Sequence, residues 1–185
     1  MATAKRTKDT ITIGSGIPYI MEFDTATGLP DEQTICVEEN RLGFVKGGAA
    51  LEYTVEPHTE KDDLGRASKI IVTAEEALLK LGLLTWNGTT LKYLIDRCKV
   101  TEETGKRIIN IGGAGNAQGK DWVICFHHID KKDGDLYVTI RGTNTAGLTL
   151  TFATDEGTVI EPEFAALPSD DEGTLVRIVE ETATA

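Results

Sequence analysis

Apolar and polar residues alternate along much of the chain, and this two-residue period predicts β-strands. Leu51, Tyr53 and Val55 alternate with polar positions, which is typical of a half-buried strand with an acidic outer face. Residues 69–73 are the expected antiparallel partner of this strand. The polar stretch 57–66 between them contains proline and glycine, so we expect a long hairpin with an exposed, charged tip.

A second hairpin is predicted further along the chain. Residues 122–128 and 136–141 flank Asp133-Gly134, a pair that favours tight turns. Apolar side chains occur on both faces of the first of these strands, so we expect it to be a buried central strand. More strands are expected at residues 148–152, 159–164 and 174–179.

One helix is expected between the strands. Thr73 and Glu76 have the spacing of a capping box, and Gly82 is placed to end a helix. The apolar positions of that helix, at helical spacing, are Ala74, Ala77, Leu78 and Leu81. The same spacing recurs at Leu91, Leu94, Ile95 and Cys98. This segment could form a second short helix or a strand, and the flanking residues do not distinguish the two.

Composition and charge restrict the class of protein. The chain has 185 residues, of which 40% are hydrophobic and 26% charged, as in a soluble globular domain. We expect one domain over residues 11–185, preceded by a flexible arm over residues 1–10. The formal net charge of −11 would repel phosphate backbones, which argues against nucleic-acid recognition. No window approaches the ~18 apolar residues of a membrane span, so no membrane association is expected.

The cysteines and the amino terminus indicate where the chain folds. Cys36, Cys98 and Cys125 are widely spaced and form no CxxC pair, so we expect free thiols in a reducing compartment such as the cytoplasm. The apolar run after the basic amino terminus is too short and too polar for a secretory signal.

No catalytic, cofactor-binding or metal-binding site is predicted. The glycine-rich stretch 111–120 lacks the spacing of a phosphate-binding loop, and we interpret it as a loop that leads into the strand at Trp122. Cys125 and His127 share one face of a predicted strand, but two ligands do not complete a metal site. We therefore expect no enzyme and no cofactor; an enzyme that uses Cys125 and His127 is the weakest alternative.

The two ends of the chain differ in charge. Residues 151–185 contain nine acidic residues and one basic residue, Arg177, whereas residues 1–8 contain three basic residues and no acidic one. The ends are therefore expected to attract each other, either within one molecule or between neighbours. Two solvated, frayed termini are the alternative.

The closing segment resembles the carboxyl end of bacteriophage major tail tube proteins. It comprises residues 159–164, 165–168 and 170–176. Further segments are similar to that family in the same order, so that the resemblance spans roughly residues 67–180. These segments are residues 69–76, 84–88, 112–120 and 147–152.

This resemblance implies a fold, an assembly and a function. The fold would be a mainly β tail-tube sandwich with one flanking α-helix, and the inner sheets of six copies would join into a continuous barrel within a hexameric ring. Rings would stack into the tail tube of a virion, which conducts DNA from capsid to host cell. The implied partners are further copies, tail terminator and tail-tip proteins, and, in the lumen, the tape measure protein and then DNA without specific binding. Folding and assembly would take place in the bacterial host cytoplasm.

Candidate assembly residues lie in two regions. Glu52, Thr54 and Glu56 are candidates for the lumen wall, where negative charge would repel passing DNA; bulk solvent outside the tube is the alternative environment for them. Inter-ring or inter-subunit contacts are expected at the hairpin tip and at the basic amino-terminal arm, which would become ordered against an acidic neighbour. These contact candidates are His58, Glu60, Lys61, Asp62, Asp63 and Arg66 in the tip, and Lys5, Arg6 and Lys8 in the arm.

Two further functions stay open from the sequence. One is a related ring or tube protein, namely a tail terminator or the inner tube of a contractile injection system, and the length of the polymer would distinguish these. The other is a non-phage β-sandwich module that binds carbohydrate or protein. The aromatic content of 6% argues against the binding module, because such sites are usually rich in aromatic side chains.

Overall fold

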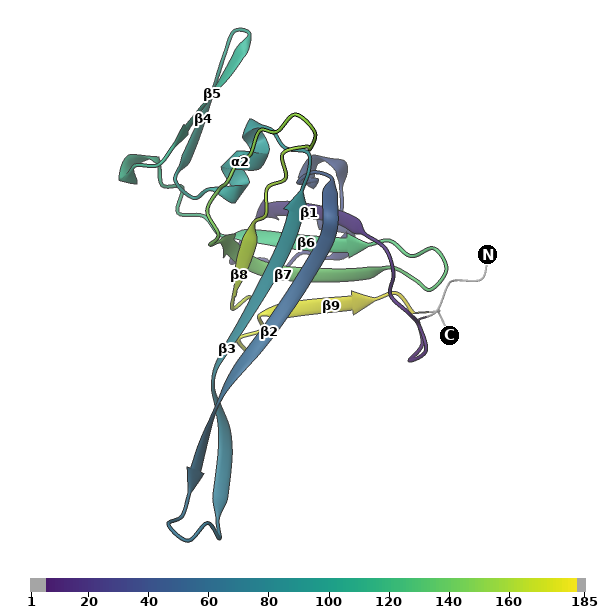
Figure 1. Ribbon diagram of the computed structural model, residues 1–185, viewed down its shortest axis with the longest axis vertical. Helices are drawn as coiled ribbons and strands as arrows, with labels where there is room; N and C mark the ends of the chain where they lie inside the picture. Colours follow the sequence, from purple (N-terminus) through teal and green to yellow (C-terminus); the bar gives the residue numbers. More distant parts are fainter. Residues whose placement is uncertain (1–5, 183–185) are drawn as a thin grey trace.

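The protein is built mainly from antiparallel β-strands, as expected. The computed structural model describes residues 6–182, and strands make up 47% of it. Figure 1 shows a compact body from which two hairpins project in opposite directions along the long axis. The main sheet comprises β1 (Gly16–Glu22), β2 (Val45–Lys61), β3 (Ser68–Leu83), β6 (Trp122–His128), β7 (Leu136–Asn144), β8 (Glu163–Leu167) and β9 (Val176–Glu180). A second sheet contains only β4 (Cys98–Glu103) and β5 (Lys106–Ile111).

The main sheet folds over on itself around β7. Its strand order is β1-β6-β7-β8-β3-β2, and β9 pairs with the first half of β7 while β8 pairs with the second half. Side chains of β1, β3, β6, β7 and β8 meet in one hydrophobic core, so the two ends of this continuous sheet face each other like the layers of a sandwich. No closed barrel forms among residues 6–182. The hexameric ring, which one chain does not test, stays a prediction.

The helix expected between Thr73 and Gly82 is wrong, because this segment is part of β3. Ala77, Leu79, Leu81 and Leu83 are buried at a period of two, and β3 pairs with β2 on one side and β8 on the other. These pairings satisfy backbone groups on both edges and outweigh the local helical spacing. Gly82 permits a close strand approach instead of ending a helix: a Cβ there would lie 2.2 Å from the carbonyl oxygen of Lys46.

The flanking helix lies later in the chain, at the second candidate segment. It is α2 (Gly88–Leu94), whose first turn is capped by Asn87 and Thr90 in a capping box. Leu91 and Leu94 are buried against the main core. The shorter helical segments are α1 (Glu32–Ile35), η1 (Glu38–Asn40) and η2 (Ala114–Asn116).

The second predicted hairpin is confirmed as β6 and β7. All residues of β6 except His127 are buried, as expected for a central strand, and Gly134 adopts a φ of 97° in the connecting turn. The glycine-rich stretch 111–120 consists of the end of β5, η2 and loop, and β6 follows it directly.

Of the last three expected strands, one is absent, one begins later than expected and one is confirmed. Residues 148–152 form no strand: Phe152 is 78% exposed and the segment pairs with none of the described strands. β8 begins at Glu163, later than predicted, although Ile160 forms an isolated bridge to Leu83. The expected strand at residues 174–179 is present as β9.

The first hairpin is confirmed but is longer than expected. Pairing between β2 and β3 continues from Glu56 through Lys61, so half of the predicted loop at residues 57–66 is strand and the turn covers only residues 62–67. Pro57 is tolerated because β2 is the edge strand of the sheet. A register shift between Glu56 and Pro57 leaves Thr73 as an extra residue on β3, and its hydroxyl donates to the Glu56 carbonyl oxygen at 2.8 Å.

None of the helices between residues 6 and 182 combines the length and the apolar character that a membrane crossing would need.

Candidate assembly surface

The far half of the β2–β3 hairpin extends away from the body of the molecule (Figure 1). We call residues 52–76 the arm. Every residue of the arm except Asp62 is exposed. An isolated two-stranded ribbon is at best marginally stable in water. Packing against a further surface would therefore stabilise this conformation.

One face of the arm carries a row of exposed apolar side chains, although Glu75 lies on the same face opposite Val55. Because paired residues share a face and alternate along each strand, Tyr53 and Val55 of β2 lie on the same face as Val72 and Ile70 of β3. Their exposed fractions are 55%, 44%, 52% and 67%, respectively. The prediction that Tyr53 and Val55 share one face is confirmed, but the prediction that this face is half-buried within the chain is wrong.

The apolar face continues onto the body. Next to Tyr53, Leu51 packs against the hydrophobic core. A shallow groove of about 470 Å³ connects both residues with Leu175, Val176 and Ile178 at β9. Ile178 is 53% exposed, so exposed apolar side chains extend from the arm to the start of β9 as an apolar strip, which Glu75 and Glu172 border in the groove.

The three lumen candidates lie on the opposite face of the arm. Glu52, Thr54 and Glu56 are exposed and alternate with the apolar side chains of β2. Lys80 lies 3.0 Å from the Glu52 carboxylate and 3.6 Å from Glu163, and the hydrogen bond to Glu52 raises the pKa of Lys80. The negative charge of this face is therefore partly balanced near the body and is unbalanced at Glu56. Whether the face lines a lumen stays a prediction.

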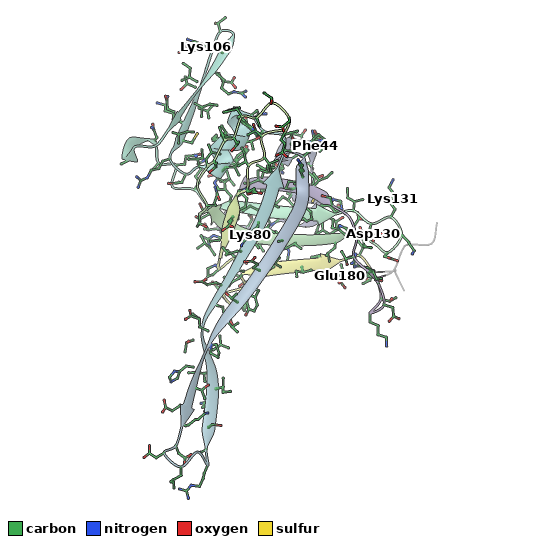
Figure 2. The ribbon with its side chains drawn as sticks, in the orientation of Figure 1. Phe44, Lys80, Lys106, Asp130, Lys131 and Glu180 are labelled. Atoms are coloured by element: carbon green, nitrogen blue, oxygen red, sulfur yellow. The ribbon has the colours of Figure 1, made fainter. Side chains whose placement is uncertain are left out.

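The structure brings the tip candidates together at the end of the arm. In the turn, the Ala67 N–H donates to the Asp62 carboxylate at 2.7 Å and lowers the pKa of Asp62. Arg66 lies 3.6 Å from the same carboxylate, and His58 lies 3.3 Å from Glu60. Lys61 and Asp63 are exposed beside them. Figure 2 shows side chains with oxygen and nitrogen atoms at the end of the arm, far from the packed body.

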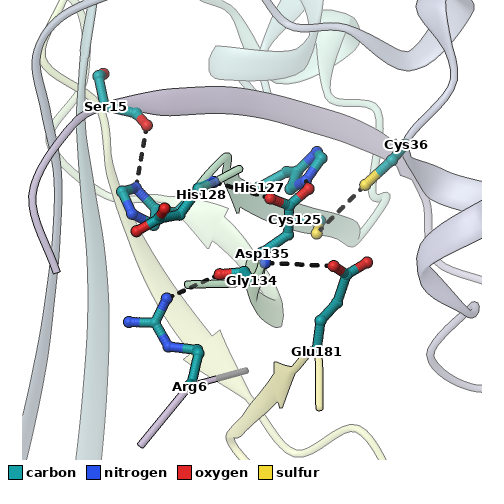
Figure 3. A network of polar contacts seen from close by, with 10 residues as sticks. Arg6, Ser15, Cys36, Cys125, His127, His128, Gly134, Asp135 and Glu181 are labelled. Atoms are coloured by element: carbon teal, nitrogen blue, oxygen red, sulfur yellow. Dashed lines mark hydrogen bonds and ion pairs between the residues drawn. The ribbon is translucent and has the colours of Figure 1, made fainter. Parts of the chain in front are cut away.

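The basic residues of the amino terminus do not join the arm tip. Lys5 lies outside the described residues. The Arg6 side chain is only 7% exposed; it donates to the Gly134 carbonyl oxygen at 3.0 Å and lies 4.0 Å from the Glu180 carboxylate (Figure 3). Attraction between the ends of the chain thus occurs within one molecule at Arg6, whereas Lys8 is exposed. That the amino-terminal residues 1–10 form a flexible extension stays a prediction.

A second projecting hairpin was missed by sequence reasoning. It consists of β4 and β5 and lies at the end of the long axis opposite to the arm (Figure 1). Glu102 pairs with Arg107 at 2.6 Å and Glu103 pairs with Lys106 at 2.9 Å on either side of the turn. The available signal was the turn sequence around Gly105, whose φ is 77°. The formal charge from Cys98 to Ile111 is +1, whereas the arm carries −4.

The residues of the enzyme alternative contact different partners. The Cys125 sulfur faces Cys36, whereas His127 contacts the Asp135 carboxylate at 2.7 Å and stacks on the Tyr137 ring. Within residues 6–182, no group of three or more His, Cys, Asp or Glu side chains is arranged to hold a metal ion. That the chain has no enzymatic activity stays a prediction.

Comparison with known proteins does not establish a family. No family model matches the chain, and no curated protein matches it. Among solved structures, a chain from the cryo-EM structure of the anti-feeding prophage cap, described as the tube terminating cap, aligns with a TM-score of 0.48 and 12% identity. The alignment covers 95% of this chain and 98% of that chain. A similarity this low carries no argument about function, and membership of the tail tube family stays a prediction.

Proposed function

We propose that this protein is a structural subunit that assembles with copies of itself into a ring of a phage-like tail. The observation that carries the proposal is the arm, because its exposed apolar strip needs a covering surface. Scattered exposed apolar residues are normal in a monomer, but a contiguous apolar strip marks an interaction site. The sequence resemblance to tail tube proteins over residues 67–180 supports the choice of a tail assembly.

Open strand edges support lateral contacts between copies. Within residues 6–182, β2 and β9 each pair with only one neighbouring strand. β2 alone presents an edge of 17 residues. Long open edges promote uncontrolled pairing, and a closed ring removes this liability by placing each edge against the next subunit.

Charge supports head-to-tail stacking along the long axis. The acidic arm and the weakly basic β4–β5 hairpin lie at opposite ends of the molecule. Such heterologous contacts repeat when each copy presents the same two ends to its neighbours. Stacking of rings on each other would make a tail tube, and stacking of one ring on an existing tube would make a terminator. In either case the tape measure protein and DNA would pass through the lumen, and tail-tip proteins would start assembly.

Negative-stain electron microscopy of the purified protein over a concentration series tests the proposal. Six-fold rings or hollow tubes are the expected result; tubes that lengthen with concentration identify a tube subunit, and rings that never stack identify a terminator. Dispersed 20 kDa particles, with and without a tail-tip initiator complex, would overturn the proposal.

An arm-shortened variant provides the matched control. Glu56 and Ala74 are a cross-strand pair, so replacing residues 57–73 with Asn-Gly closes the hairpin by a two-residue turn. The hydrophobic core contains no residue of the deleted segment, so the variant should fold. We expect it to stay monomeric at concentrations at which the natural chain assembles. Equal assembly of the two chains would show that the arm is not the assembly surface.

A further inference from the structure

Two thiols face each other on the side of the sheet that does not contact the main core. Cys36 directly follows α1, and Cys125 lies in the middle of β6. Their sulfur atoms are 3.9 Å apart although the residues are 89 positions apart in the chain (Figure 3). Both are free thiols, and the proposed assembly function uses neither.

The two thiols differ in access to solvent. Cys125 is completely buried in a small second core with Tyr19, Ile35 and Val123. Cys36 packs against the edge of the same core and is partly exposed. A small reagent from solution would therefore reach Cys36 first, while Cys125 is held directly behind it.

The surroundings favour a thiolate in this pair. The pKa of Cys125 is lowered because the Cys36 thiol donates a hydrogen bond to it, whereas donating that hydrogen bond and burial raise the pKa of Cys36. Thr139 is itself completely buried beside Cys125, on the neighbouring strand β7. The thiolate is the reactive form in thiol oxidation.

The segment that carries Cys36 is fastened to the sheet on both sides of it. Before Cys36, the Arg177 guanidinium of β9 donates to the carbonyl oxygens of Leu29 and Pro30. After Cys36, the Leu42 N–H donates to the Pro18 carbonyl oxygen of β1 at 2.9 Å. These contacts hold the thiol over β6, while Cys36 itself lies outside regular secondary structure and can adjust locally.

We propose that Cys36 and Cys125 form an oxidisable dithiol that a peroxide converts into an intrachain disulfide. As the Cys36 proton passes along the contact to the Cys125 thiolate, the Cys36 sulfur attacks the peroxide O–O bond, and a sulfenic acid and one water form. The Cys125 sulfur then attacks the Cys36 sulfur, and the hydroxyl leaves with the Cys125 proton as a second water. Overall, two thiols and one hydrogen peroxide give one disulfide and two waters. The sulfur atoms must approach by about 2 Å to reach the disulfide length.

The bond would fix the Cys36 segment to the sheet. It would close a loop of 89 residues, and cross-links that span long loops restrict the unfolded chain most. For a chain of this size we expect the melting temperature to rise by about 5–10 °C on oxidation and to return on reduction.

Treatment of the purified full chain with hydrogen peroxide tests the proposal. After alkylation in denaturant we expect the number of free thiols to fall from three to one, with a mass loss of about 2 Da that reports two lost hydrogens. Peptide mapping should find residues 36 and 125 in one cross-linked peptide. The control variant Cys98→Ser should form the same cross-link, so that its thiols fall from two to none, whereas Cys36→Ser should keep its two thiols.

Several results would overturn the proposal. Four outcomes would each show that this pair packs without acting as a dithiol. They are retention of all three thiols, a cross-link that contains Cys98, a disulfide-linked dimer on a non-reducing gel, and addition of two oxygens to Cys36 without a cross-link. A cross-link between residues 36 and 125 with an unchanged melting temperature would refute the expected stabilisation by the disulfide.

Discussion

Removal of the apolar side chains of the arm should weaken self-association without destabilising the subunit. The change is the combined substitution Tyr53→Ser, Ile70→Ser and Val72→Ser. Their exposed fractions lie between 52% and 67%, so roughly half of each side chain is already in water in the isolated chain. Surface substitutions usually act within about 0.5 kcal/mol each, so the three together should lower the free energy of unfolding by no more than about 1.5 kcal/mol.

The effect on association follows from the area that a neighbour would cover. Complete burial of a large apolar side chain is worth about 1.5–3 kcal/mol, so covering the exposed half of each is worth about 1 kcal/mol. The three together contribute about 3 kcal/mol to each contact, which corresponds to a loss of affinity of about 150-fold. The concentration at which assembly begins should rise by about two orders of magnitude.

Sedimentation velocity over a range of concentrations measures this shift. Phe152→Ser is the matched control, because Phe152 is 78% exposed on a loop outside the arm. Thermal melts followed by circular dichroism check that both variants stay folded. If the triple variant assembles at the same concentration as the natural chain, the apolar strip is not an assembly surface. If Phe152→Ser weakens assembly equally, the effect is not specific to the arm.

Three further predictions concern the stability of the subunit. Phe164 is completely buried between β3 and β7, so Phe164→Ala should cost about 3–5 kcal/mol and lower the melting temperature by about 10 °C in calorimetry; a drop below 3 °C would contradict this. Gly142→Ala should yield mainly insoluble protein, because a Cβ would lie 2.3 Å from the Ala165 carbonyl oxygen; a soluble variant with an unchanged melting temperature would refute this. Hydrogen bonds from Thr34 lower the pKa of Asp31 in the folded chain, so this stabilisation is present above about pH 4 and is lost as the pH falls through the lower folded value. Melts between pH 5 and 2 should therefore show a weaker acid dependence in Asp31→Asn, and identical profiles would exclude this contribution.

Local sequence patterns are sufficient for several elements of this fold. The alternation at residues 122–128 and the Asp133-Gly134 turn predict the β6–β7 hairpin, because both signals lie within one short stretch of chain. The helical spacing at Leu91 and Leu94 indicates a possible helix where α2 forms, but the sequence leaves a strand equally open there. Polar residues and glycine in the arm predict an exposed hairpin tip, although not its length.

The candidate site was predictable only in part. The sequence identifies the charged tip and places Glu52 and Glu56 on one face of a strand. It does not reveal that Tyr53 and Val72 are left exposed by the rest of residues 6–182, because exposure depends on where the rest of the sheet ends. The β4–β5 hairpin was missed, since its opposed position to the arm depends on the packing of the whole body.

The sequence alone determined the two-residue period, the central hairpin and the acidic balance, all of which are local or additive properties of the chain. Only the tertiary structure decided that the segment around Leu79 is a strand, because its partners β2 and β8 satisfy its backbone on both edges. Likewise, only the fold places Cys36 against Cys125 across 89 positions. Pairing and burial between distant segments depend on the whole fold, so local periodicity does not encode them.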